Sequence, residues 1–147
     1  MKKLSFIVLL VAVMFGISSC EYQVVDGKYH TLTFDVPVKH SQWKWDSNAG
    51  QYYYTWEETA INKDVYNYGS WNVSREYNYR TNDAYQQLLP LTINCSYNVN
   101  DSTVAYYSQL IDYRVGIGYV EFQVTNSDFQ YMASEPEDMQ FRVQIVY

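Results

Sequence analysis

Apolar and polar residues alternate along most of this chain, in short segments separated by turn-forming residues. The clearest segment runs from Leu91 to Val99, where odd positions are apolar and even positions are polar. Segments at 104–115, 119–125 and 141–145 repeat this period of two. Such alternation is typical of strands with one buried face. With turns between the segments, it favours an all-β fold, and we expect an antiparallel β-sandwich of about seven to eight strands over residues 29–147.

Single residues refine this picture. Ile61 and Val65 follow a helical spacing between Thr59, a good N-cap, and Gly69, a common helix stop, so we expect one short helix there. Pro37 lacks a backbone donor and predicts an edge strand or a strand end. Arg75 interrupts the apolar alternation of Trp71, Val73, Tyr77 and Tyr79, so we expect a break in that strand. The apolar positions of 141–145 predict a final strand paired within a sheet, because unpaired buried backbone groups are costly.

Aromatic residues concentrate between positions 43 and 56. If a turn at 46–51 places Trp45 opposite Tyr52, Lys44, Tyr53 and Thr55 lie on one face of the hairpin. The other face then carries a row of five rings: Trp43, Trp45, Tyr52, Tyr54 and Trp56. The row can be a core face, since large aromatics bury about 150–250 Å² each. Alternatively, it can be an exposed ligand-binding platform for sugar rings or a protein partner.

The first twenty residues differ in kind from the rest. Lys2 and Lys3 are followed by an apolar run over 4–17 and then by small residues, which is the layout of a secretory signal peptide. As a helix the run spans about 21 Å, short of the roughly 30 Å of a bilayer core. We therefore expect residues 1–19 to be cleaved rather than to remain as a membrane-spanning anchor.

The end of this segment carries the most specific motif in the chain. Ile17-Ser18-Ser19-Cys20 resembles the lipobox of bacterial lipoproteins, in which an aliphatic residue and two small residues precede a cysteine. The resemblance implies that Cys20 becomes the first residue and carries fatty acids such as palmitate, which hold the protein on a membrane. Residues 20–28 would form a lipidated tether whose last eight residues reach at most about 28 Å. We expect the location to be the cell envelope, at the outer membrane.

Charge and cysteine content narrow the classes of partner. Loss of Lys2 and Lys3 would change the net charge from −6 to −8. Nucleic-acid binding needs a basic footprint, so we exclude it, and attachment to the membrane would depend on the lipid. Acylation of Cys20 leaves Cys95 without a disulfide partner. Its apolar position in the 91–99 segment predicts an inert thiol on the core face rather than a reactive site.

Signals for catalysis or metal binding are weak. His30 and His40 have no acidic residue at ligand spacing, so we expect surface or sheet-edge histidines and no metal site. Motifs for a nucleophilic serine or a phosphate loop are missing from the sequence. A glycosidase needs only two carboxylates, and the candidates are Glu57, Glu58, Asp112 and Glu121. The acidic cluster at 135–138 lacks the ligand pattern of a calcium loop, so we expect a solvated turn. We predict a protein without catalytic residues or cofactor.

One short motif suggests a modification. Asp101-Ser102-Thr103 looks like the Asp-Ser/Thr-x acceptor for O-glycosylation in envelope proteins of gut bacteria, with Ser102 as the acceptor. It falls in an expected turn, where a transferase can reach it. The alternative is a chance match, because three-residue motifs are common.

Longer motifs that look like strand cores and turns follow in the second half of the chain. They are Ile111-Asp112-Tyr113, Gly118-Tyr119-Val120-Glu121-Phe122, Thr125-Asn126-Ser127-Asp128-Phe129 and Pro136-Glu137-Asp138-Met139-Gln140-Phe141-Arg142-Val143. With the aromatic positions 43–45 and 52–54, they resemble a group of small Bacteroidota-type lipoproteins over roughly residues 40–147. The resemblance implies a cell-envelope location and a β domain, and it implies no activity.

Three functional hypotheses follow. The first is a non-enzymatic envelope lipoprotein that binds a glycan or another envelope protein through its β domain. The second is a structural or accessory subunit of a surface assembly, docked by strand addition at a sheet edge. The third is a small hydrolase that depends on Glu57 or Glu121.

Overall fold

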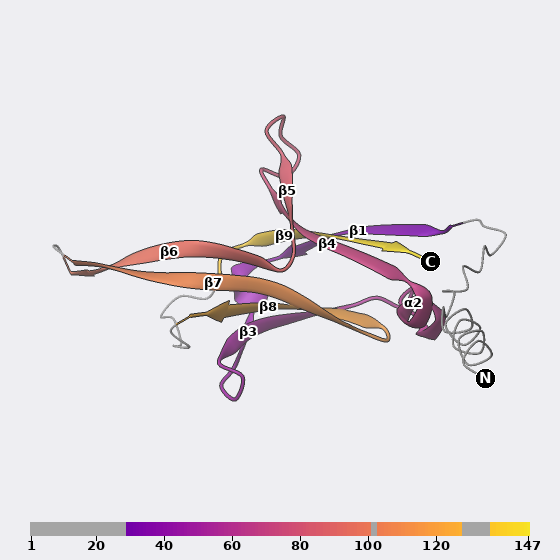
Figure 1. The fold of residues 1–147 in the computed structure, drawn as a ribbon, viewed down its shortest axis with the longest axis horizontal. Helices are drawn as coiled ribbons and strands as arrows, with labels where there is room; N and C mark the ends of the chain where they lie inside the picture. The colour runs from indigo at the N-terminus through magenta and orange to yellow at the C-terminus, as the bar shows by residue number, and fades with distance from the viewer. Residues whose placement is uncertain (1–28, 101–102, 128–135) are drawn as a thin grey trace, which may run out of the picture.

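Nine strands arranged in two antiparallel sheets make up most of the described part of the protein (Figure 1). The computed structural model describes residues 29–100, 103–127 and 136–147. In chain order the elements are β1 (Thr31–Val38), the 3-10 helix η1 (His40–Gln42), β2 (Lys44–Asp46), β3 (Gln51–Glu57), α2 (Lys63–Tyr68), β4 (Ser70–Tyr77), β5 (Tyr85–Leu88), β6 (Leu91–Asn100), β7 (Thr103–Gly116), β8 (Tyr119–Asn126) and β9 (Met139–Val146). The predicted all-β sandwich is confirmed, with one or two more strands than expected.

The two sheets differ in whether neighbouring strands are also consecutive in the sequence. Sheet A has the strand order β1-β9-β4-β5, and sheet B has the order β2-β3-β8-β7-β6. In sheet A the last strand lies between β1 and β4, so distant parts of the chain meet there. In sheet B, β6, β7 and β8 are joined in sequence as hairpins. The expectation that the C-terminal strand pairs within a sheet is confirmed, and Pro37 lies in the edge strand β1.

Inward-facing side chains of both sheets form the core. Along β9 every second residue is buried, from Met139 to Ile145. Phe141 stacks on Phe122 of sheet B with ring centroids 4.1 Å apart, and Trp43 meets Phe141 edge-on at 6.4 Å. Aromatic pairs in these geometries add to the free energy gained by burying their surface. The two sheets are therefore joined at the centre of the sandwich by rings from three different strand regions.

The short helix α2 connects sheet B to sheet A, and its buried residue Val65 faces the core. A helix was predicted here, but Thr59 was the wrong N-cap. The side-chain oxygen of Asn62 accepts hydrogen bonds from the backbone N–H groups of Asp64 (2.9 Å) and Val65 (3.0 Å). Asn and Thr are both good caps, so only the position of the first turn distinguishes them. Gly69 ends the helix as expected, and a Cβ there would lie 2.4 Å from the carbonyl oxygen of Val65.

The β6–β7 hairpin extends past the other strands at one end of the sandwich (Figure 1). At its base Leu91 and Ile93 pack against the core, whereas Tyr97 and Val99 farther along are exposed. Cys95 lies between these two parts, on the predicted face, and is only half-buried. The prediction of a core thiol was therefore wrong about burial, because sheet A ends before it covers this part of the hairpin.

Arg75 does not break β4, contrary to the sequence prediction. It keeps the inward alternation, opposite Phe141 of β9, and is 5% exposed. Its guanidinium lies 4.4 Å from the centroid of the Tyr77 ring and forms an ion pair with Glu137. A buried cation needs such partners. Asp138 forms a second ion pair, with Lys39 at 2.8 Å. The segment 136–138, which leads into β9, is therefore held to the sandwich by two ion pairs and is not only a solvated turn.

Candidate binding clefts on the outer faces of the sheets

The predicted aromatic row forms, and it faces the core. Trp45 lies opposite Tyr52 as the sequence suggested, with ring centroids 4.9 Å apart. Trp43 and Tyr52 are 4% and 2% exposed, and Trp45, Tyr54 and Trp56 pack against the core. Of the two interpretations of the row, the core face is the one that the structure supports. Clefts lie instead on the outer faces of the two sheets.

On the outer face of sheet A, four strands each contribute one polar side chain to a single network. The four are Asp35 of β1, Arg142 of β9, Glu76 of β4 and Gln86 of β5. Arg142 bridges the two carboxylates, with its Nε 2.9 Å from Asp35 Oδ1 and its Nη2 3.2 Å from Glu76 Oε1. The Gln86 amide also donates to Glu76 Oε1, at 2.9 Å. Strand alternation places all four side chains on one face, and the strand register makes them neighbours.

Electrostatics within this network favour its charged form. The hydrogen bond from Arg142 lowers the pKa of Asp35 and is the largest effect. Burial opposes it by raising the pKa, and the hydrogen bond from the Tyr79 hydroxyl, a smaller effect than burial, lowers the pKa again. The pKa of the Arg142 guanidinium is raised by its hydrogen bond to Asp35. Both groups therefore stay ionised across the physiological pH range.

The loop between β4 and β5 covers one side of this network and borders an open cleft, which we call the Glu76 cleft. Tyr79 donates a hydrogen bond from its hydroxyl to Asp35 Oδ2 at 2.9 Å. Asn78 and Arg80 on either side of it have positive φ angles of 52° and 63°. Non-glycine residues adopt positive φ angles at some cost in free energy, so the surrounding structure must impose them. Such residues are found often at functional sites. The cleft measures about 350 Å³, within the usual range for ligand pockets.

The Glu76 carboxylate is the least satisfied group of the cleft. Glu76 is 9% exposed, and Arg142 and Gln86 both bind its Oε1. Among the residues that the structure describes, none makes a hydrogen bond to its Oε2. A buried oxygen without a donor costs about 1–3 kcal/mol, so this position attracts a hydrogen-bond donor.

A second cleft lies on the outer face of sheet B, beside the half-buried ring of Tyr53. It measures about 250 Å³ and is lined by Asp46, Gln51, Tyr53, Arg114 and Glu121. Both oxygens of Glu121 are engaged: Oε1 by Gln123 and Arg114 at 2.9 Å, and Oε2 by Arg114 at 3.0 Å. This carboxylate is therefore already satisfied, in contrast to Glu76.

The four carboxylates considered for hydrolysis do not share this cleft. Glu121 meets Asp46 there, which the sequence did not single out. Glu58 accepts a hydrogen bond from the backbone of Ala60 at 2.9 Å, whereas Glu57 and Asp112 lie opposite Tyr119 and Gln123 in the strand ladders. The hydrolase hypothesis remains untested, and the described geometry adds no support to it.

The remaining predicted sites divide between surface positions and positions outside the described residues. His30 and His40 are both exposed. Within residues 29–100, 103–127 and 136–147, three His, Cys, Asp or Glu side chains nowhere gather as metal ligands would. None of the helices in these ranges has the length and apolar character to cross a membrane. Cys20, the signal peptide at 1–19, the tether at 20–28 and Ser102 lie outside the described residues.

Sequence reasoning missed Glu76, Tyr79 and Arg142. Their only signal was an outward strand position or a place in a polar loop, which many other residues share. Compared with protein-family models, with curated proteins and with solved structures, the chain matches none. The resemblance of residues 40–147 to small Bacteroidota-type lipoproteins therefore stays a prediction.

Proposed function

We propose that this protein is a non-enzymatic lipoprotein of the bacterial cell envelope that binds a glycan in the Glu76 cleft. The observation that carries the proposal is the composition of this cleft. Carboxylates, two guanidinium groups and an amide converge there beside the ring of Tyr79, and no described residue donates a hydrogen bond to Glu76 Oε2. Sugars offer many hydroxyl donors and acceptors together with C–H faces that pack on aromatic rings, so they match this mixture better than an apolar ligand does.

The proposed anchor suits capture close to a membrane. The expected tether between Cys20 and the first strand at Thr31 is short, so the sandwich would sit near the lipid surface. Two or three acyl chains would hold it there essentially permanently. The proposal therefore joins membrane attachment at one end of the chain to ligand binding on the outer face of sheet A.

Two measurements test the proposal. Mass spectrometry of the membrane-extracted protein should find an acylated Cys20 at the N-terminus, and a Cys20→Ala variant should lose the lipid and the membrane fraction. The full lipidated protein in detergent should bind members of a glycan array, and Tyr79→Ala should abolish that binding. A soluble, unacylated wild-type product would refute the anchor, and a blank array with folded protein would refute the ligand.

A second candidate function is an accessory subunit that docks by strand addition. The observation in its favour is β6, a ten-residue edge strand of sheet B without a charged residue. Long uncharged edges pair readily with another chain. Co-purification of a stoichiometric partner that is lost on Ser96→Pro would favour this function, because proline removes a backbone donor within β6.

A further inference from the structure

A second hollow adjoins the Glu76 cleft and shares two residues with it. This hollow measures about 250 Å³ and is also lined by Glu76 and Tyr79. Its other walls come from the end of β1, the start of β9 and the turn after β4, at Pro37, Val38, Lys39, Asn78, Asp138, Met139 and Gln140. The two hollows share walls formed by Glu76 and Tyr79, and we call the pair of them the sheet A groove.

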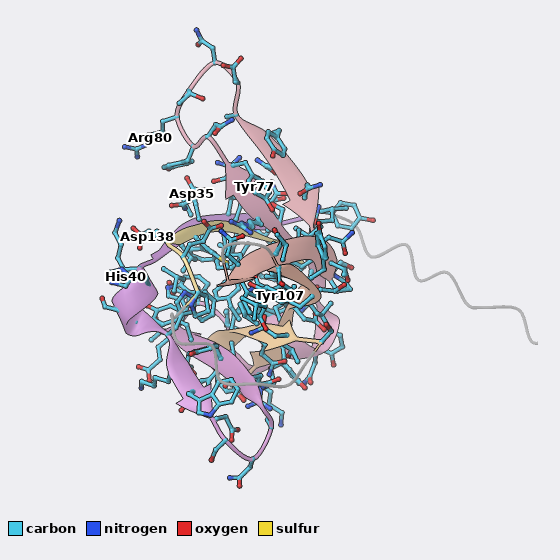
Figure 2. The ribbon with its side chains drawn as sticks, turned by 90° about the vertical axis from the view of Figure 1, so that its left-hand side faces the viewer. Asp35, His40, Tyr77, Arg80, Tyr107 and Asp138 are labelled. Carbon is cyan, nitrogen blue, oxygen red and sulfur yellow. The ribbon has the colours of Figure 1, made fainter. Side chains whose placement is uncertain are left out.

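The groove runs along one side of the molecule. In Figure 2, Arg80, Asp35, Asp138 and His40 follow one another down this side, from the β4–β5 loop to the 3-10 helix η1. Tyr79 stands between the hollows, with its hydroxyl fixed to Asp35 and the Arg80 guanidinium 5.0 Å from its ring centroid. A ligand that fills only one hollow therefore leaves the other open.

Charge within the groove is balanced. Its three carboxylates are Asp35, Glu76 and Asp138, and its three cations are Lys39, Arg80 and Arg142. Arg142 pairs with two of the carboxylates, and Lys39 pairs with the third at 2.8 Å. The exposed Arg80 has no ion-pair partner among the described residues, but an anionic ligand that reached it would still meet the spare oxygen of Glu76 with a like charge. A hydroxyl can donate to that oxygen, so the groove favours an uncharged ligand.

We infer that the sheet A groove binds a linear, uncharged saccharide of at least two units, which crosses Glu76 and places one unit on each side of Tyr79. This inference rests on the proposed glycan binding and specifies the ligand of that site. Glu76 Oε2 is buried in this structure, and it accepts a hydrogen bond from a sugar hydroxyl when the carboxylate turns toward the hollows. Tyr79 separates the two subsites, and Gln140 belongs to the second subsite alone.

Isothermal titration of the full lipidated protein in detergent tests ligand length and charge. The probes are neutral gluco-, manno- and xylo-oligosaccharides of one to four units, together with oligogalacturonates of the same lengths. In at least one neutral series, affinity should rise about tenfold or more from one unit to two or three, because a second subsite becomes occupied. Oligogalacturonates should bind at least tenfold more weakly than the neutral chains.

Three variants locate the binding. Glu76→Gln should weaken the longer neutral chains about tenfold, since it replaces the acceptor. Glu58→Gln is the matched control, because Glu58 is a half-buried carboxylate that also accepts a hydrogen bond and lines none of the clefts described above, and it should leave affinity unchanged. Gln140→Ala changes a partly exposed side chain and should weaken binding of chains but not of single sugars. This third variant keeps the test valid if Glu76→Gln fails to fold, which circular dichroism would reveal.

The outcomes separate this inference from the proposed function. Equal affinity for one and three units, or preference for oligogalacturonates, would overturn the inference and leave glycan binding intact. Binding that survives Glu76→Gln and Gln140→Ala but is lost on Tyr53→Ala would move the site to sheet B and also overturn the inference. Failure of every saccharide to bind folded protein would overturn the proposed function itself.

Discussion

Strand β9 and the β6–β7 hairpin have the same alternating sequence pattern and opposite environments. In β9 the inward residues Phe141, Val143 and Ile145 are fully buried between two neighbouring strands and beneath sheet B. In the outer part of the hairpin, Tyr97 and Val99 occupy equivalent apolar positions and are exposed. Alternation therefore tells which side chains share a face, and the arrangement of the sheets decides whether anything covers that face.

The largest expected difference between these regions concerns folding itself. Removal of residues 142–147 takes away the C-terminal part of β9 and most of its pairing with both β1 and β4. We expect no soluble, protease-resistant protein, because both neighbouring strands lose their ladder partners and the core opens. Replacing residues 97–105 with an Asn-Gly turn keeps Ser96 opposite Tyr106, so it should shorten the hairpin and leave the fold intact. Folded protein after the first change would contradict the central role of β9.

Single substitutions should repeat this contrast on a smaller scale. Phe141→Ala removes a buried ring that stacks on Phe122, and the free energy of unfolding should fall by about 3–5 kcal/mol. Tyr106 of β7 is 81% exposed, and Tyr106→Ala should change it by less than about 0.5 kcal/mol. Urea titrations followed by tryptophan fluorescence measure both. Similar losses in the two variants would mean that the hairpin is covered in solution.

Acid should remove the stability that Asp138 contributes at the start of β9, within a defined range of pH. Hydrogen bonds from the Lys39 side chain and the His40 backbone lower the pKa of Asp138 from 3.8 to about 2. Because the pKa is lower in the folded state, this contribution to stability is complete above about pH 4 and is lost as the pH falls through 2. Asp138→Asn should therefore lower the melting temperature at pH 6, and the difference from wild type should vanish near pH 2. A difference that is constant with pH would contradict this account.

The smallest effect on stability, and the sharpest probe of the hairpin, is the reactivity of Cys95. A half-buried thiol should react with a maleimide in the folded protein, more slowly than in urea. Val143→Cys in a Cys95→Ser background places a thiol at a buried position of β9, where it should resist the reagent until the protein unfolds. Equal protection of the two thiols, measured by mass spectrometry, would restore the original prediction of a core cysteine.

The candidate site was much harder to predict than the core. The sequence placed Trp45 opposite Tyr52 because a local turn fixes the register of a hairpin. It could not place Asp35, Glu76 and Arg142 together, because they come from β1, β4 and β9, which the chain connects through long excursions. Arg75 shows the same limit, since its partner Glu137 lies 62 positions away in the sequence. Local alternation predicts which face of a sheet a side chain lies on. Which side chains lie next to it on the adjacent strands depends on the pairing of strands that are distant in the sequence.

The sequence by itself determined the all-β class, the inward and outward faces of the strands, the aromatic hairpin and the presence of a short helix. Each of these depends on interactions within a few residues, where periodicity and turn chemistry act directly. Tertiary structure decided that β9 lies inside sheet A, that Tyr97 and Val99 in the outer part of the β6–β7 hairpin are exposed, and that the Asp35–Arg142–Glu76 network borders a groove. These features depend on which distant strands pair and where each sheet ends. Apolar and polar residues alternate in the same way whichever strands pair, so the alternation cannot decide between pairings.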